Sequence, residues 1–243
     1  MIRRMVAAAA VIGGGIAAYR LAVEPWWRTW GVDPAETAKP LAGDEIVEGG
    51  VAAETRGITI HAPPASVWPW LVQMGFGRAG WYSYDAVDMR GSSADRILPE
   101  HQALAVGDVL PTHPGGGFVV KSVEPERHRV LYMDAVLARE QAEAAQAINA
   151  ETPSNLRMAG AFMENGQPTD FTATWAFVLE DLGDGRTRLI ERFRIRFGDA
   201  DDKPWTRLTL PVIGFGLFVM MRKQLLGIRD RAERAEGRHL VAA

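Results

Sequence analysis

One acidic side chain interrupts an otherwise apolar strand face late in the sequence. Between residues 188 and 197, apolar side chains alternate with arginines, giving Leu189, Glu191, Phe193, Ile195 and Phe197 on one face and Arg188, Arg192, Arg194 and Arg196 on the other. A carboxylate within an apolar face must be paired, hydrogen-bonded or protonated. Glu191 is therefore expected either to be the polar contact of a cavity, with Arg78 or Arg96 as its partner, or to lie at a rim or in a structural ion pair.

A second candidate group is aromatic and could form pocket walls with hydrogen-bonding tips: Trp70, Trp81, Tyr82, Tyr84 and Trp175. Tyr82, Tyr84 and Asp85 follow a glycine-rich loop and are polar enough to face the mouth of a cavity. Trp70 and Trp175 could equally be core residues. Asp95 and Arg96 are expected either to form a pair that fixes this loop or to be an exposed ion pair of little energetic value.

The other sequence motifs are better explained by structural roles than by nucleotide binding, hydrolysis or metal binding. Residues 75–80 match G-x-G-x-x-G, but a helix is expected before them, and the dinucleotide fingerprint needs a strand there. No G-x-S-x-G is present, and the histidines show no i,i+4 pairing. We therefore expect no metal and no cofactor.

Length and charge narrow the class of protein further. The 243 residues suit one domain with appendages, and 27 basic against 30 acidic residues give a net charge of −3. No basic field attracts nucleic acid, so a nucleic-acid partner is not expected. The absence of cysteine excludes disulfides, thiol nucleophiles and Cys-ligated metals.

The expected elements give an α+β order instead of repeated βαβ units. A strand over 55–62 precedes a helix that Ser66 caps and Gly75 ends, and a second short helix is expected over 81–85. Strands follow over 105–111, 118–123 and 130–133, and then a hairpin pairs 171–179 with 189–197 around Gly183-Asp184-Gly185. Residues 135–149 are expected to be helical and 151–170 loop-like, together forming an insertion. Asp202 is expected to cap a long C-terminal helix that begins at Pro204 and runs to about Arg234.

That last helix has an apolar stripe formed by residues three or four apart: Leu210, Ile213, Leu217, Met221, Leu225 and Ile228. Phe215, Phe218 and Val219 lie off the stripe. One interpretation is a lid helix buried on a curved antiparallel sheet. The other lets these three side chains contact a bilayer, so that an apolar ligand passes between membrane and cavity.

The first thirty residues are predicted to form a membrane anchor. Arg3 and Arg4 precede an uncharged run from Met5 to Tyr19, and the pair Trp26-Trp27 suits a membrane interface. A cleaved signal peptide and a soluble alanine-rich helix are the alternatives. The arginines near the start favour a single-pass protein of the cell membrane whose domain is extracytoplasmic.

The segment Ile58–Gln73 (ITIHAPPASVWPWLVQ) resembles the opening of the SRPBCC (START-like, helix-grip) superfamily, in its polyketide cyclase/dehydrase and lipid-transport branch. Further stretches resemble a membrane-tethered bacterial subgroup of that branch: WYSYD at 81–85, SADRILPE at 93–100, VGDV at 106–109, TWAFVL at 174–179 and LLGI at 225–228. The resemblance covers 54–134 and 171–235. It implies a deep apolar cavity between a curved sheet and the C-terminal helix, and no single chemistry.

The expected organisation is an anchor (1–30), a linker (31–53), a helix-grip domain (54–235) with an insertion (135–170), and a tail (236–243). The first functional hypothesis is a membrane-tethered module that binds a hydrophobic small molecule or lipid through Trp70, Trp81, Trp175, Phe193 and the residues named with them above. A second is a cyclase- or dehydratase-type enzyme that uses Glu191 or Asp85 with a tyrosine. A third is an envelope interaction protein with a filled core and no ligand.

Overall fold

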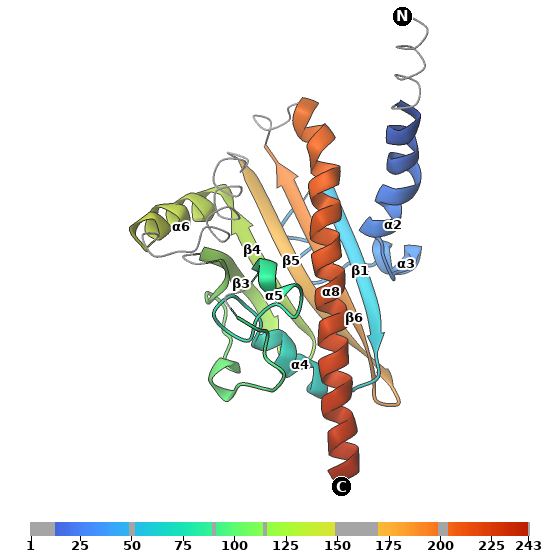
Figure 1. Ribbon diagram of the computed structural model, residues 1–243, viewed down its shortest axis with the longest axis vertical. Helices are drawn as coiled ribbons and strands as arrows, with labels where there is room; N and C mark the ends of the chain where they lie inside the picture. Colours follow the sequence, from blue (N-terminus) through green and yellow to red (C-terminus); the bar gives the residue numbers. More distant parts are fainter. Residues whose placement is uncertain are drawn as a thin grey trace, which may run out of the picture.

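The computed structural model describes residues 13–48, 52–88, 91–113, 116–148, 170–198 and 204–242. It is an α+β fold in which a long helix, α8 (Pro204–Ala242), crosses one face of a six-stranded antiparallel sheet (Figure 1). The strands, in the spatial order β1-β6-β5-β4-β3-β2, are β1 (Ala52–Ile60), β6 (Arg186–Phe197), β5 (Phe171–Gly183), β4 (His128–Asp134), β3 (Gly116–Glu124) and β2 (Val109–His113). The other helices are η1 (Tyr19–Val23), α2 (Glu24–Arg28), α3 (Pro34–Ala38), α4 (Pro64–Val72), α5 (Asp85–Asp88), η2 (Pro99–His101) and α6 (Ala135–Ile148).

The expected fold class is confirmed, and so is the expected hairpin. β5 and β6 pair in one long antiparallel ladder, and the three residues between 183 and 185 all have positive φ, which matches the right-handed twist of the hairpin. α8 begins at Pro204, as expected for a residue that lacks an N–H and has a fixed φ. The capping role predicted for Asp202, and the loop predicted over 151–169, lie outside the described residues.

Two local expectations are wrong. Helix α4 begins at Pro64 with Pro63 at the N-cap, so Ser66 lies inside the first turn, and its Oγ donates to Glu236 Oε2 of α8 at 2.7 Å. The short helix expected over 81–85 begins only at Asp85. Tyr82 has a φ of 57°, a left-handed conformation that no helix continues through, so residues 81–84 form a turn instead.

The core lies between the inner face of the sheet and the helices α4 and α8. Buried side chains from β1, β5 and β6 meet Leu71 of α4 and Leu225 and Ile228 of α8: Ile60, Phe177, Leu179 and Leu189. α8 also passes very close to the turn at Tyr82, where a Cβ on Gly227 would lie 2.3 Å from the Tyr82 carbonyl oxygen. Only glycine permits this approach, which holds the 81–84 turn against the helix.

The apolar stripe predicted for α8 is confirmed at Leu225 and Ile228 and is wrong at two other positions. Leu217 is 45% exposed, whereas Phe218, expected off the stripe, is only 2% exposed. The reason is a partner that the sequence pattern does not reveal: Phe218 packs against the rings of Trp27 and Trp30, with centroids 6.2 and 6.3 Å away. The side chains of Leu210 and Ile213 lie outside the described set.

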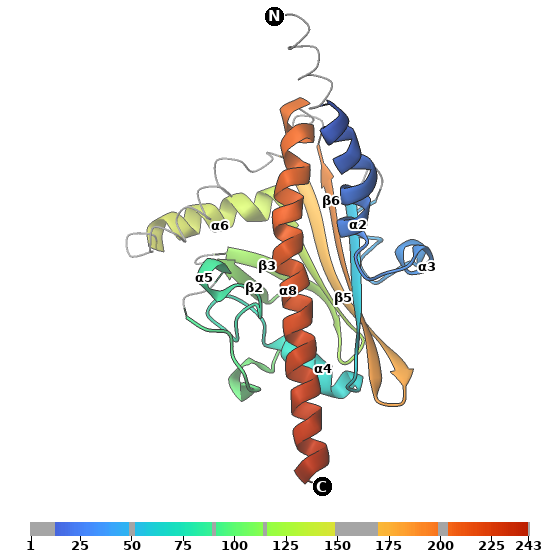
Figure 2. The ribbon, with the colours of Figure 1, turned by 45° about the vertical axis from the view of Figure 1, so that its right-hand side comes forward.

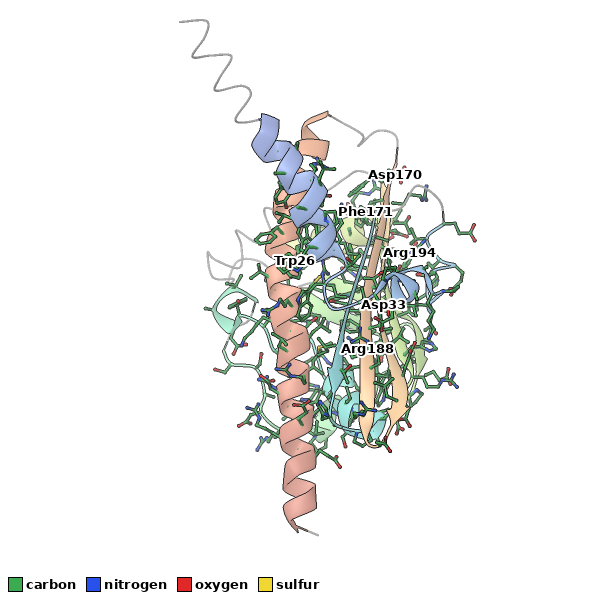
Figure 3. All side chains as sticks on the ribbon, turned by 90° about the vertical axis from the view of Figure 1, so that its right-hand side faces the viewer. Trp26, Asp33, Asp170, Phe171, Arg188 and Arg194 are labelled. Carbon is green, nitrogen blue, oxygen red and sulfur yellow. The ribbon has the colours of Figure 1, made fainter. Side chains whose placement is uncertain are left out.

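The opposite face of the sheet is covered by residues 31–48. Arg188, Arg192 and Arg194 of β6 point to this face, as the alternation predicts, and bind the segment through carboxylates and backbone carbonyls (Figure 3). Arg192 alone donates to the carbonyls of Glu36, Thr37 and Lys39 and to Asp44. The expected linker therefore lies flat on the domain and completes its outer layer.

The N-terminal helix lies alongside α8 (Figure 2). Residues 13–28 are continuously helical, with a π-helical turn at η1. Trp27, expected at a membrane interface, is fully buried instead, while Trp26 is 54% exposed. Within the described ranges no helix combines the length and apolarity needed to cross a bilayer; the predicted anchor begins in residues 1–12, which are not described.

Candidate functional site

Glu191 lies on the inner face of the sheet and is completely buried. It sits on β6 opposite Phe177 of β5 and Arg56 of β1. Its Oε1 accepts a hydrogen bond of 2.7 Å from the indole Nε1–H of Trp175, whereas its Oε2 has no hydrogen-bond partner. The rim position considered from the sequence is therefore wrong, because Glu191 is buried within the apolar face.

The cation beside Glu191 is Arg56, not Arg78 or Arg96. Arg56 Nη1 lies 3.9 Å from Glu191 Oε2, and the guanidinium is fully buried. Arg78 instead donates to the carbonyls of Val72 and His101, and Arg96 contributes its carbonyl to Gln73. Arg56 lies two and four positions before Ile58 and Ile60, which face the core, so the alternation of the strand also directs Arg56 inward.

Arg56 connects four elements of the structure. Its Nη2 forms an ion pair with Glu54 of β1, and its Nε donates to the carbonyl of Trp27 in α2 at 3.2 Å. Its Nη1 lies 2.9 Å from the sulfur of Met221 in α8, and its guanidinium lies over the ring of Phe218 at 5.5 Å. The N-terminal helix, two strands and the C-terminal helix therefore all meet at this side chain.

One cation serves two carboxyl groups here, and the geometry favours Glu54. The contact with Glu54 is the closer of the two, while Glu191 lies beyond hydrogen-bond distance. Burial raises the pKa of Glu191, and the opposing effects of the Arg56 charge and the Trp175 N–H do not cancel it; the Glu54 carboxylate raises it further. The neutral form of Glu191 therefore persists to higher pH than that of an exposed glutamate, and in that form the carboxyl can both donate and accept a hydrogen bond.

Aromatic side chains surround Trp175, the hydrogen-bond partner of Glu191. The indole of Trp81 stacks on that of Trp175 at 5.5 Å and 19°, and Phe118 meets it edge-on at 5.7 Å. Phe118 in turn meets Phe193 edge-on at 6.5 Å. Of the residues predicted to bind a ligand, the structure brings together Trp81, Trp175, Glu191 and Phe193, and it adds Phe118, which the sequence analysis missed.

Beyond Glu191 the inner face of the sheet changes from buried to half-buried. We call this section the open apolar face; its half-buried members are Phe118, Phe193, Ile195, Phe197, and Leu137 and Ala138 of α6. Met133, Phe171 and Ala173 form its buried floor. Gln141 fixes α6 beside β3, because its side-chain amide bonds both the N–H and the carbonyl of Gly117 at 2.8 and 2.9 Å.

The remaining predicted residues serve the structure elsewhere. Trp70 is a core residue, as its alternative interpretation held, and its ring meets Tyr82 edge-on at 6.0 Å. The hydroxyl of Tyr82 donates to the Trp70 carbonyl and accepts from Gln73, and burial raises its pKa to about 12. Tyr84 is 44% exposed.

Asp85 and the Asp95–Arg96 dipeptide organise loops. Asp85 accepts from the backbone N–H and the hydroxyl of Ser93, the latter at 2.5 Å, so it ties residues 85 and 93 together. Asp95 and Arg96, both described, form no ion pair with each other, and the charge of Asp95 acts on Arg231 instead. Neither Asp85 nor Glu191 has a described hydrogen bond to a tyrosine.

A second buried arginine lies in the same cross-strand row as Glu191 and Arg56, two strands away from Glu191 on β4. Arg129 of β4 is fully buried, donates to the carbonyl of Leu71 at the end of α4, and lies 4.7 Å over the Phe177 ring. Among the described residues, no carboxylate is within ion-pair distance of it, and its Nε and Nη2 have no hydrogen-bond partner. Burial, with a smaller effect from the charge of Arg78, lowers its pKa to about 9.

Cation and metal sites give no further candidate in the described part of the chain. No group of three or more His, Asp or Glu side chains there is arranged to hold a metal ion. A shallow hollow on α8 is lined by Asp230, Glu233 and Arg234, and Glu191 does not line it. The arrangement around Glu191 therefore remains the strongest candidate site.

No protein-family model matches the chain, and no curated protein matches it. Among solved structures, a protein from Mesorhizobium loti is similar at 14% identity with a TM-score of 0.37, over 75% of this chain and 98% of that one. A conserved protein from Geobacillus kaustophilus is similar at 12% identity and a TM-score of 0.36, over 76% and 97%. Ara h 8.0201 aligns at 11% identity and a TM-score of 0.26, over 75% and 98%. All of these TM-scores are low, so these similarities do not indicate a function for this chain.

Proposed function

We propose that this protein binds a hydrophobic small molecule or lipid on the open apolar face, beneath α8. The observation that carries the proposal is the change along one strand face: Leu189 is fully buried, Glu191 is buried with a free carboxyl oxygen, and Phe193 and Ile195 are half-buried. Monomeric proteins rarely leave a large contiguous group of apolar side chains partly exposed unless something binds there.

The chemistry of the site indicates a mostly apolar ligand with one polar group. Aromatic and aliphatic walls supply affinity through burial, about 25 cal/mol for each Å² removed from water. A neutral Glu191 carboxyl can accept from a ligand hydroxyl or donate to a ligand carbonyl at its Oε2, and it costs less to cover than a carboxylate would. The Trp175 N–H holds the carboxyl in place through Oε1.

The family that we propose is the SRPBCC superfamily that the sequence resembles. The support is the order of the elements: a first strand, the helix α4, a run of antiparallel strands and a long last helix that lies across them (Figure 1). In this proposal, the ligand lies on the open apolar face beside Phe193 and Phe197, and the stacked rings of Trp81 and Trp175 close the inner end of the site.

The proposal also includes a membrane tether. Its support is the sequence before Glu24, with two arginines followed by an uncharged run from Met5 to Tyr19. Because Glu24 and Trp27 are buried in the domain, we place the end of the tether before Glu24. The arginines near the start favour a cytoplasmic N-terminus and an extracytoplasmic domain.

A neutral fluorescent probe tests the ligand site. We expect N-phenyl-1-naphthylamine to bind the full-length, detergent-solubilised protein saturably, and Ile195→Gln to weaken that binding roughly tenfold by placing an amide on the open apolar face. Leu182→Gln is the matched control, because Leu182 is an exposed leucine on the β5–β6 turn, away from the site. Equal binding by both variants and the wild type would remove the open apolar face from the proposal.

A further inference from the structure

A second apolar surface lies where the N-terminal helix meets α8. We call it the helix-pair patch; its exposed members are Val23 and Trp26 on one helix and Phe215 and Val219 on the other, at 37%, 54%, 37% and 37% exposure. The buried ring of Phe218 joins them, because it meets Trp26 at 5.4 Å and Phe215 at 5.9 Å. The patch is therefore one continuous surface and not four isolated side chains.

The patch and the open apolar face lie toward the same end of the molecule. Figure 3 shows Trp26 and Phe171 both toward the end at which the N-terminal helix leaves the domain. Phe171 belongs to the floor of the open apolar face. A membrane that covers the helix-pair patch would therefore lie toward the same end of the molecule as the open apolar face.

The surroundings of the patch fit a lipid bilayer. Arg20 and Arg28 flank it on the N-terminal helix, where both pair with the buried Glu24 and leave a net positive charge. On α8, the guanidinium of Arg222 lies 4.9 Å over the ring of Trp30. Apolar side chains with tryptophan at the edge and arginines around them are typical of surfaces that enter the headgroup region.

The chain that precedes the patch also favours a bilayer over a protein partner. The uncharged run that begins at Met5 continues into the helix that carries Val23 and Trp26. A segment of this kind brings the patch to a membrane at high effective concentration, so that a few apolar side chains suffice for contact.

We propose that the helix-pair patch rests in the headgroup region of the bilayer and points the open apolar face toward the membrane. This inference rests on the membrane tether of the proposed function, but not on the identity of the ligand. It assigns the folded domain its own contact with lipid, in addition to the tether.

Because the chain contains no cysteine, single cysteines can report this contact in the full-length protein. Val219→Cys places a probe in the patch, and Asp230→Cys places one at an exposed position farther along the same helix. Each is labelled with an environment-sensitive nitrobenzoxadiazole dye and reconstituted with vesicles of phosphatidylcholine and phosphatidylglycerol. We expect a blue-shifted emission at residue 219 only, with roughly threefold stronger quenching by nitroxide lipids there than at residue 230.

Flotation of the same samples separates the two proposals. Protein that floats with vesicles while residues 219 and 230 report the same environment would overturn the patch contact and leave the tether standing. Protein that does not float would overturn both the tether and the patch contact, and the probe titration of the open apolar face would still decide the ligand proposal. Circular dichroism of both labelled proteins shows that they are folded.

Discussion

Arg56 on β1 and Arg129 on β4 lie at the two ends of one row across the inner face, with Glu191 and Phe177 between them, and their hydrogen-bond and charge partners differ. Both are completely buried on inward positions of strands. Arg129 has a backbone carbonyl and an aromatic ring as partners and no described carboxylate, whereas Arg56 has Glu54, Glu191, the Trp27 carbonyl and two aromatic rings. The β4 end of this row therefore has a cation with no described carboxylate partner, and the β1 end has two carboxyl groups beside one cation.

This difference indicates that Arg129 has a structural role and that Glu191 is the candidate site residue. The carbonyls of Trp70, Leu71 and Val72 at the end of α4 accept hydrogen bonds from Tyr82, Arg129 and Arg78. The negative end of the helix dipole therefore faces this cation, which explains Arg129 without a ligand. No comparable explanation exists for the free oxygen of Glu191, which lies where the packing of the sheet face loosens.

The largest loss of stability is expected from substitutions of Arg129. Arg129→Ala should lower the free energy of unfolding by about 3 kcal/mol, because it creates a cavity beside Phe177 and removes the donor to the Leu71 carbonyl. Urea denaturation followed by tryptophan fluorescence measures this. Arg129→Met fills most of the volume and should cost only about 1 kcal/mol, because the lost contact with the α4 carbonyl end is largely offset by removal of a buried cation that no described carboxylate pairs. If Met lowers the free energy of unfolding as much as Ala does, the positive charge of Arg129 itself stabilises the fold, and Arg129 is not a cation in excess.

The next effect concerns which carboxylate Arg56 serves. Arg56→Met should cost about 2 kcal/mol, because the Trp27 carbonyl and Glu54 lose their donor. A double-mutant cycle at pH 7 should give a larger coupling energy between Arg56 and Glu54 than between Arg56 and Glu191. A larger coupling with Glu191 would show that Glu191 is the charged partner, and the neutral carboxyl of the proposed site would have to be abandoned.

Glu191→Gln should change how the free energy of unfolding depends on pH more than it changes the magnitude of that free energy. Because the folded-state pKa of Glu191 is raised, the folded protein keeps a proton that the unfolded chain loses as the pH rises past 4.5. The wild type should therefore lose stability from that pH up to the raised pKa of Glu191, and the Gln variant should lack this component. Denaturation curves between pH 4 and pH 8 test the sign. A wild type that instead gains stability relative to Glu191→Gln over this range contradicts a raised pKa.

The smallest effect is expected on the outer face, where Arg188 pairs with Glu36 through contacts of 2.6 and 2.8 Å. Arg188→Gln should cost less than about 1 kcal/mol, because the pair is partly exposed to water. The hydrogen bond from Arg188 lowers the pKa of Glu36, so this contribution is present at neutral pH and disappears as the pH falls through that lowered pKa. Thermal denaturation at pH 7 and pH 3 should show the difference between variant and wild type shrinking in acid, opposite in direction to Glu191.

Much of the fold was predictable because it follows from side-chain periodicity. The alternation over 189–197 predicted that Glu191 shares the apolar face and that the arginines share the other face, and Pro204 predicted the start of α8. Arg56 and Arg129 were missed although both have the same parity as inward neighbours, Ile58 and Leu131. An arginine at a strand position is ordinarily assumed to face water, and only tertiary partners such as the Trp27 and Leu71 carbonyls reverse that preference.

The partners of the site were less predictable, because they come from distant segments. Phe118 meets Trp175 across the sheet, and Phe218 is buried by tryptophans nearly two hundred residues earlier in the chain. No local pattern encodes such contacts. The turn at Tyr82 similarly depends on the close approach of Gly227, which periodicity does not show.

Native mass spectrometry of the full-length protein, released gently from detergent, tests the central proposal most directly. We expect the wild type to carry one bound apolar molecule after purification, Ile195→Gln to carry much less of it, and Leu182→Gln to carry as much as the wild type. Unliganded protein in all three samples, or equal occupancy in all three, would contradict a ligand site on the open apolar face.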